Sequence, residues 1–234
     1  MDRFFYAPPE SFSDTGDVIL SPDEARHAIK ALRLRPEDIV TVVDGQGLAA
    51  KVQIVRADRN EVLGRMISID QNLGEPSWTL TIGLALLNQH RRYELFLEKA
   101  VELGVTQIIP LTTDRTQSKI WREDRAVQVM IAALKQCHRS KLPILHPVTS
   151  FRDAVHEGTL IADPNADQPI LQEIHTAGDS VTFLIGPEGG WTDQELQCAR
   201  KHGGKLVRLG PLSLRAETAA ICCAASMMLN NPYK

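Results

Sequence analysis

The chain has 234 residues, of which 43% are hydrophobic, and a formal net charge of −3. This length accommodates one large domain or two small ones, and the hydrophobic share suffices for a packed core. The slightly negative charge argues against a protein that coats nucleic acid without specificity, although it is compatible with a local basic patch. The four cysteines form no CxxC pair, and no stretch is long and apolar enough to cross a membrane. We therefore expect a cytoplasmic protein with reduced thiols, no metal and no membrane association.

Residues 1–72 are predicted to form a small β-rich unit. Short apolar runs recur there with turn signals between them, which is typical of a compact barrel. The runs cover residues 3–6, 18–20, 39–43, 49–55 and 62–69. Asp44-Gly45-Gln46-Gly47 separates two of these runs and predicts a hairpin turn.

One helix is expected to interrupt these strands. Ser21 is its predicted N-cap, Pro22 its first residue and Glu24 the acid of a capping box. The helical pattern continues to Leu34. The first unit therefore combines a barrel with a single helix.

Basic residues gather on one face of this predicted helix. Arg26, Lys30 and Arg33 are spaced at i, i+4 and i+7, and His27 lies beside them. Such a face can be merely solvated, or it can follow the phosphates of a nucleic acid. Spacing alone does not distinguish the two.

A second pattern begins after a short polar segment with Gly and Pro at residues 72–76, so we place the domain boundary after residue 72 and expect domains at 1–72 and 73–234. Strands are predicted at residues 80–87, 106–111, 144–145, 160–162, 181–185 and 206–209, and helices at 92–103, 122–139, 151–156, 192–202 and 216–229. Repeated βα units of this kind predict a mainly parallel sheet with helices on both faces.

Two glycine-containing loops follow the last two predicted strands. Residues 186–190 read GPEGG, and residues 210–215 read GPLSLR. Ligands of open α/β sheets bind at the carboxyl ends of the strands, so we expect both loops to line one small-molecule site. Neither a GxGxxG fingerprint after the first strand nor a Walker A sequence is present, which excludes the ordinary dinucleotide and P-loop sites.

Charged residues in these loops suggest chemistry beyond a simple turn. Glu188 places a carboxylate where a phosphate cradle would prefer Lys or Arg, so a cationic ligand is favoured. Arg215 could bind a phosphate or a base edge, or pair with Glu188. Glu217 and Thr218 are sufficiently explained as caps of the following helix.

The segment from residue 115 to residue 141 is strongly basic, against an acidic whole. Eight basic residues accompany only two acidic ones, which favours an anionic partner, most simply nucleic acid. His90, Arg91 and Arg92 add cations at the end of the preceding strand. A solvated helix would explain any three of these residues but not the full set.

Taken together, the motifs resemble the SPOUT class of S-adenosylmethionine-dependent RNA methyltransferases, and within it the family that methylates N3 of a uridine in bacterial 16S ribosomal RNA. The matching stretches are RFF at 3–5, the His27 helix with LR at 32–33, EKAVELGV at 98–105, residues 136–143, LIGPEGGWTDQE at 184–195 and LGPLSLRAETAA at 209–220. They follow the family's order along nearly the whole chain.

This resemblance implies an α/β fold with an N-terminal PUA-like β-barrel domain and a C-terminal SPOUT-like parallel sheet, flanked by helices and containing a trefoil knot. The knot is an exception to the rule that chains do not thread loops. The cofactor would be S-adenosylmethionine, held largely by backbone. The partners would be 16S ribosomal RNA, within the small ribosomal subunit, and a second copy of the chain in a homodimer.

The resemblance also implies roles for individual residues. Arg215 would orient the target nucleotide or stabilise its developing anion, and Glu188 would handle charge or a proton. The cofactor pocket would comprise Leu160, Ala162, Asp163, Leu184, Ile185, Gly186, Pro187, Glu188, Gly189, Gly190, Leu209, Gly210, Leu212, Leu214 and Thr218. RNA contacts would come from Arg3, Arg26, His27, Lys30, Arg33, Arg122 and Arg139.

Two other functions fit the same motifs. One is a SPOUT methyltransferase of different specificity, such as transfer to a ribose 2′-oxygen. The other is a non-catalytic RNA-binding factor of ribosome assembly that keeps the fold.

Overall fold

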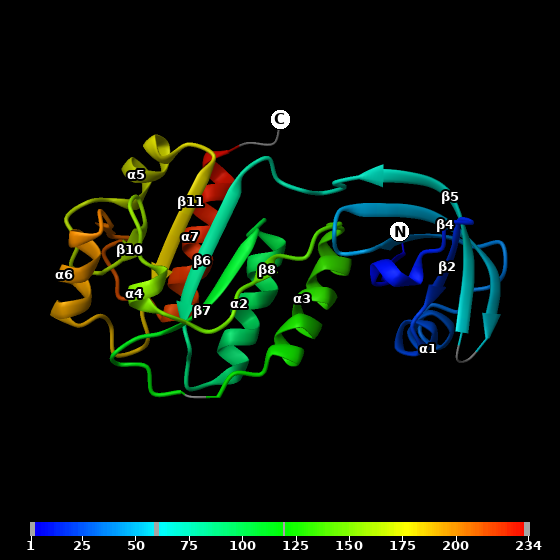
Figure 1. Ribbon diagram of the computed structural model, residues 1–234, viewed down its shortest axis with the longest axis horizontal. Coiled ribbons are helices and arrows are strands. Elements are labelled where there is room, and N and C mark those ends of the chain that lie inside the picture. Colours follow the sequence, from blue (N-terminus) through cyan, green and yellow to red (C-terminus); the bar gives the residue numbers. More distant parts are fainter. Residues whose placement is uncertain (1–2, 59–60, 119, 232–234) are drawn as a thin grey trace. The chain divides into compact units, whose positions relative to one another are not determined.

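The computed structural model describes residues 3–58, 61–118 and 120–231 (Figure 1). These fall into two compact units. The first contains the chain up to Glu75 together with Ile131–Leu142, and the second contains Pro76–Met130 and the chain from Pro143 onward. The domain boundary expected after residue 72 stays a prediction.

The first unit is built on a five-stranded sheet in the order β1-β3-β4-β5-β2. Its strands are β1 (Phe4–Tyr6), β2 (Asp17–Leu20), β3 (Ile39–Val43), β4 (Leu48–Asp58) and β5 (Glu61–Gln71), and a 3-10 turn, η1, spans Pro9–Ser11. β1 pairs with β3 in parallel, and the other pairs are antiparallel. In the predicted hairpin between β3 and β4, a carboxylate oxygen of Asp44 accepts hydrogen bonds from the amides of Gln46, Gly47 and Leu48.

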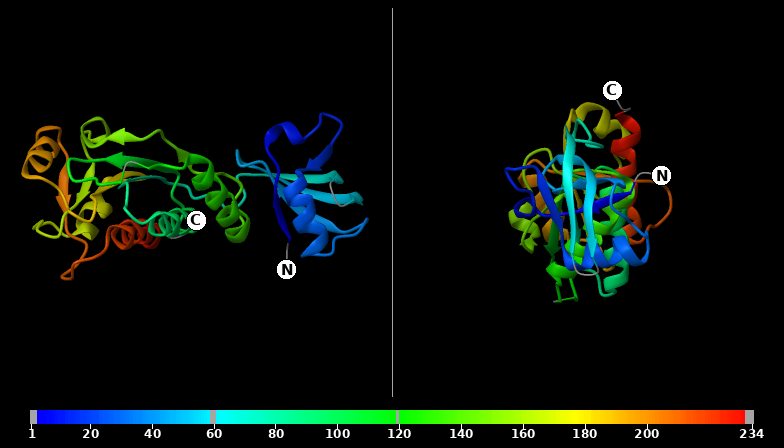
Figure 2. Two further views of the ribbon diagram at one scale, coloured as in Figure 1. Left: turned by 90° about the horizontal axis from the view of Figure 1, so that it is seen from below. Right: turned by 90° about the vertical axis from the view of Figure 1, so that its right-hand side faces the viewer.

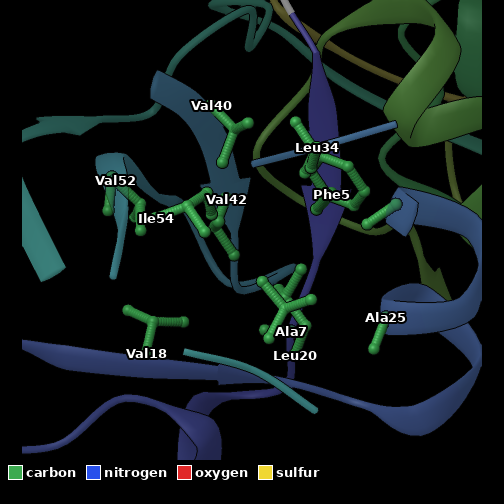
Figure 3. Packing of buried hydrophobic residues seen from close by; sticks show 13 residues of the cluster. Phe5, Ala7, Val18, Leu20, Ala25, Leu34, Val40, Val42, Val52 and Ile54 are labelled. Atoms are coloured by element: carbon green, nitrogen blue, oxygen red, sulfur yellow. The ribbon is translucent and has the colours of Figure 1, made fainter. Parts of the chain in front are cut away.

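Alternating side chains from these strands form one hydrophobic cluster (Figure 3). Phe5 of β1, Val42 of β3 and Ile54 of β4 point into it, each at most 1% exposed. Leu34 closes the cluster from the segment that follows the helix. Burial of these side chains is the main term that holds the small unit together.

The helix α1 (Pro22–Lys30) is shorter than predicted. The prediction is wrong beyond Lys30, because Arg33 adopts a left-handed φ of 52° and turns the chain so that Leu34 can be buried. Ser21 does cap the helix, since its hydroxyl accepts from the amide of Glu24 at 3.3 Å. The expected reciprocal bond of a capping box is absent among the described contacts, because the Glu24 carboxylate accepts instead from Lys135.

The second unit contains a parallel sheet in the order β12-β10-β11-β6-β7-β8, with β9 paired to β7. Its strands are β6 (Thr79–Ala85), β7 (Gln107–Thr112), β8 (Ile144–Leu145), β9 (Thr149–Ser150), β10 (Leu160–Ala162), β11 (Ser180–Ile185) and β12 (Lys205–Val207). Every pairing among them is parallel, as the repeated βα pattern predicts.

Helices cover this sheet on both faces (Figures 1 and 2). They are α2 (His90–Glu102), α3 (Glu123–Cys137), α4 (Phe151–Ala154), α5 (Ile170–Ala177), α6 (Asp193–Lys201) and α7 (Ala216–Asn230), and the residues of α3 from Ile131 onward belong to the first unit. α7 packs on β6, β11, α2 and α5, while α4 and α6 pack on each other and on β7 and β12. α5 was not predicted.

Candidate functional site: a cleft at the ends of three parallel strands

A cleft of about 670 Å³ lies where β10, β11 and β12 end. Ala162, Ile185 and Val207 are the last residues of these strands and stand in register, so the three following loops leave the sheet side by side. The lining residues are Gln89, Arg92, Arg115, residues 162–165, residues 185–191, Asp193, Leu196, Leu209, Gly210, residues 212–216 and Ala219. The two loops predicted to share one site therefore do line one cleft.

The loop after β11 is held from behind by Trp191. The indole Nε1 donates to the carbonyl of Ala162 at 2.9 Å and so joins this loop to the end of β10. A Cβ at Gly186 would approach the indole ring at 3.1 Å, so glycine permits this close packing. Gly190 has a φ of +68° and closes the turn with a hydrogen bond to the carbonyl of Pro187.

A second set of contacts fastens the same loop to the segment after β7. Glu195, 3% exposed, forms the predicted capping box with Thr192 and also accepts from the amide of Asp114 at 3.0 Å. Arg115 donates from Nη1 to the carbonyl of Gly189 at 2.7 Å. The Glu195 carboxylate thus joins two loops of the cleft, because one oxygen accepts from the Asp114 amide and the other from the Thr192 amide.

Gly210 has no structural need to be glycine. Its φ lies outside the left-handed region, and among the described residues other than its two neighbours no atom lies within 4 Å of where a Cβ would be. Neither backbone strain nor packing explains the residue, but a side chain at this position would take space in the cleft. Bare backbone at this wall fits a ligand that approaches the main chain closely, as expected for S-adenosylmethionine.

Arg92 joins two carboxylates at the wall of the cleft. Its Nε and Nη2 donate to the two oxygens of Glu217 at 2.7 and 2.6 Å, and its Nη1 donates to Oε1 of Glu188 at 3.1 Å. The hydrogen bond with Glu217 raises the pKa of Arg92. Burial by itself would raise the pKa of Glu217, but the hydrogen bonds from Arg92 hold it below its usual range.

This arrangement corrects two interpretations of the sequence. Glu188 pairs with Arg92 and not with Arg215. Glu217 lies in the first turn of α7, as expected, but capping does not explain it fully, because Arg92 binds both of its carboxylate oxygens. Arg92 and Arg115 were recognised only as members of a basic region. No local signal could have identified them as parts of the site, because their partners lie 125 and 74 residues away in the sequence.

Arg215 is the N-cap residue of α7 and lines the cleft. Its side chain is exposed, and within the described part of the chain its guanidinium donates no hydrogen bond. Arg92 and Arg115 donate to protein acceptors, whereas the donors of Arg215 have no acceptor among the described residues.

Most of the residues predicted to bind cofactor line the cleft. Ala162, Asp163, Ile185, Gly186, Pro187, Glu188, Gly189, Gly190, Leu209, Gly210, Leu212 and Leu214 all do so. Leu160, Leu184 and Thr218 do not. Leu160 and Leu184 are buried, Leu184 in the cluster beneath α4 and α6. Thr218 lies in the first turn of α7, between Ala216 and Ala219, which do line the cleft.

The residues predicted to contact RNA fall into two groups. Arg26, His27, Lys30 and Arg33 in the first unit and Arg122 in the second are exposed, and Arg3 pairs with Asp38 while partly exposed. Arg33 does not extend the face of α1, because the helix has ended before it. Arg139 is a wrong prediction as an RNA contact, since it is 4% exposed and pairs with buried Glu75 at 2.8 Å.

The described residues also bear on metal binding and on membrane insertion. They include no cluster of three or more His, Cys, Asp or Glu side chains that could hold a metal. No helix there is long and apolar enough to cross a membrane.

Comparison with known proteins identifies the family. A model of the RNA methyltransferase domain matches residues 74–228, and a model of the RNA methyltransferase PUA domain matches residues 20–67. The structure of a ribosomal RNA small subunit methyltransferase E from Neisseria gonorrhoeae, bound to S-adenosyl methionine, is 30% identical over 98% of each chain, with a TM-score of 0.88. The chain belongs to the ribosomal RNA small subunit methyltransferase E family.

Two further comparisons agree. The Rickettsia conorii enzyme is 29% identical over 93% of this chain and 91% of its own length. A methyltransferase from Legionella pneumophila, solved with bound S-adenosylmethionine, is 27% identical over 98% of each chain, with a TM-score of 0.83. Family membership confirms the predicted architecture of an N-terminal PUA-like β domain and a C-terminal parallel-sheet methyltransferase domain flanked by helices.

Proposed function

We propose that this chain transfers a methyl group from S-adenosylmethionine to N3 of a uridine in 16S ribosomal RNA, within the small ribosomal subunit and therefore in the cytoplasm. The observation that carries the proposal is the cleft at the ends of β10, β11 and β12. At Gly210 the cleft wall is main chain without a side chain, although the packing of the described residues would allow a Cβ there. A relative of the same fold and family binds S-adenosyl methionine.

The cleft's own residues supply what transfer to uracil requires. S-adenosylmethionine, when bound, supplies a methyl group on a positively charged sulfur. The acceptor N3 must lose its imide proton, so negative charge develops on the uracil ring and its oxygens. The free guanidinium of Arg215 can donate to those oxygens. Glu188 is held by Arg92, so we assign it an electrostatic role and leave proton removal unassigned.

Contact with RNA is proposed for the exposed basic residues. Arg26, His27 and Lys30 lie on α1, and Arg122 directly precedes α3. Exposed cations of this kind bind phosphates without reading sequence, so they would hold and orient the RNA while the cleft selects the nucleotide.

A homodimer is also proposed. α2 and α7 pack together in the second unit, and both carry large exposed apolar side chains, Leu95 at 43% and Leu229 at 76%. A second copy could cover them. Sedimentation equilibrium should give twice the chain mass of 26.0 kDa, and a monomer at micromolar concentration would contradict the dimer. The trefoil knot expected from the resemblance stays a prediction as well.

Methyl transfer to purified small subunits from a strain that lacks the enzyme tests the function. We expect labelled methyl to enter 16S RNA in the subunit and to block reverse transcription at one uridine, because N3 lies on the base-pairing edge. Label without such a block would indicate the ribose 2′-oxygen. The absence of label from both subunits and naked RNA would overturn the proposal and favour a non-catalytic factor.

Substitution of Arg215 tests its role separately. Arg215→Ala should lower the rate of transfer about 100-fold or more, while the affinity for S-adenosylmethionine changes less than about twofold. Arg208→Ala is the matched control, since Arg208 is exposed nearby but does not line the cleft. Normal turnover by Arg215→Ala would remove Arg215 from the mechanism.

A further inference from the structure

The ion cluster of Arg92, Glu188 and Glu217 carries an excess of negative charge. One guanidinium serves two carboxylates, so the cluster has a net charge of −1 when all three groups are ionised. Arg92 and Glu188 line the cleft directly, and Glu217 lies behind them, with a side chain that is 6% exposed. The charge is therefore built into the wall of the ligand site.

The other charged residues of the cleft do not cancel this excess. The described residues that line it include three arginines, Arg92, Arg115 and Arg215, and three carboxylates, Asp163, Glu188 and Asp193. Adding Glu217 gives four carboxylates against three guanidiniums. Oε2 of Glu188 accepts no hydrogen bond from any described residue, so one carboxylate oxygen remains available toward the cleft.

From this charge we infer that the cluster of Arg92, Glu188 and Glu217 selects the cationic methyl donor over the neutral product of transfer. This deepens the proposed function and rests on it. S-adenosylmethionine has a sulfonium, whereas S-adenosylhomocysteine has a neutral thioether, so the two differ by one positive charge and one methyl group. A net negative wall attracts the sulfonium of the donor and has no net charge to attract on the thioether of the product.

The inference gives Glu188 a role that does not need proton transfer. It favours entry of the donor and departure of the product, which would otherwise compete for one cleft. Arg92 is a positioning residue in this scheme, because it holds the Glu188 carboxylate at the wall and ties it to Glu217 on α7.

Binding without RNA tests the inference. Isothermal titration calorimetry should measure the affinities of the wild-type chain for S-adenosylmethionine, for S-adenosylhomocysteine and for the analogue in which a protonated amine replaces the sulfonium. Glu188→Gln should weaken the donor and the charged analogue by about five- to tenfold, and the neutral product by less than about twofold. Equal weakening of all three ligands would overturn the inference.

A matched control and a test without substitution complete the design. Glu94 lies on the same helix as Arg92 and also pairs with an arginine, Arg125, but it is outside the cleft. Glu94→Gln should therefore leave the ratio of the affinities for donor and product unchanged. In the wild type, the preference for the donor over the product should fall as salt rises from 0.05 to about 0.5 M, because the Glu188 side chain is 34% exposed and salt reaches it, unlike the buried carboxylate of Glu217. A ratio that salt does not change would count against the charge mechanism even if Glu188→Gln fails to fold.

The outcomes separate this inference from the proposed function. Failure of the wild type to bind either ligand would overturn both. Binding of both ligands with a ratio that Glu188→Gln leaves unchanged would overturn only the selection by charge, and methyl transfer to the small subunit would be unaffected.

Discussion

Two of the three arginines that line the cleft are placed in the opposite way to the basic residues of α1. Arg92 is shared by two carboxylates, and Arg115 donates to the carbonyl of Gly189. On α1, Arg26 has only its exposed neighbour Asp23, and Lys30 has no polar partner within the described part of the chain. The guanidiniums of Arg92 and Arg115 are therefore held in place before a ligand binds, whereas the basic side chains of α1 remain free to contact a ligand.

The difference separates two uses of positive charge. A charge that is fixed in a partly buried wall can distinguish small ligands, because the wall does not reorganise on binding. A charge on an exposed, mobile side chain can adapt to a long polyanion, and its effect depends on salt. Arg139 shows that sequence position does not decide which use applies, since it lies in the most basic segment and is buried.

The largest effect should come from Arg139→Ala. The substitution leaves Glu75 buried and without this partner, which should lower the free energy of unfolding by about 4 kcal/mol. Arg122→Ala removes an exposed arginine and should change it by less than about 0.5 kcal/mol. Urea unfolding measures both. If Arg139→Ala proved as mild as Arg122→Ala, the pair with Glu75 would contribute nothing measurable to stability.

Arg92→Met should have the next largest effect. It leaves Glu217 buried beside a cleft without its guanidinium, at a cost of about 3 kcal/mol in the free energy of unfolding. Arg125→Met breaks the pair with Glu94, in which the Arg125 side chain is 54% exposed, and should cost less than about 1 kcal/mol. If both variants lost the same free energy of unfolding, the ion pair that α2 makes at the cleft would be no stronger than the one that it makes at the surface.

The sequence predicts the loops of the site better than the charges in it. Glycine and proline at 186–190 and 210–211 mark where strands end, and parallel strands bring such ends together, so the cleft follows from local signals. The partner of Arg92 depends on where α7 returns to the sheet. That is a property of topology, and no spacing near Arg92 indicates it.

The elements that were mispredicted have local explanations. α5 begins after Pro169 without a side-chain hydrogen bond at its cap, so it lacks the usual starting signal. Its buried Ile170 and Ile174 are spaced by one turn and are the only pattern that could have indicated it. α1 ends early because the burial of Leu34 in the first unit's core outweighs helix propensity.

A smaller effect is expected when the α1 face is neutralised. Arg26→Ala combined with Lys30→Ala should weaken binding of the substrate RNA about tenfold and reduce the salt slope of the association constant by about 1 to 2, with little effect on stability. Arg56→Ala with Arg65→Ala removes equal charge from exposed positions on β4 and β5. If both pairs of substitutions weakened binding equally, net charge would matter and the α1 face would not.

The smallest effect should be the pH dependence of stability that Glu217 contributes. Because the pKa of Glu217 is lowered in the folded chain, its stabilisation is complete above the unfolded-state pKa of about 4.3 and is lost as pH falls through the lower folded-state value. The free energy of unfolding should therefore decline below about pH 5, and Glu217→Gln should make that decline shallower.

Salt distinguishes this contribution from those of partly exposed carboxylates. Asp38 and Glu94 also have lowered pKa values, the first through the amide of Arg35 and the second through Arg125. Salt at about 0.5 M should screen the interactions of these two with their arginines but not the buried pair of Arg92 and Glu217. The difference between wild type and Glu217→Gln in the acid range should thus survive high salt. If it disappeared, the charge of Glu217 would be as accessible to solvent as those on α1, and the contrast between the two regions would fail.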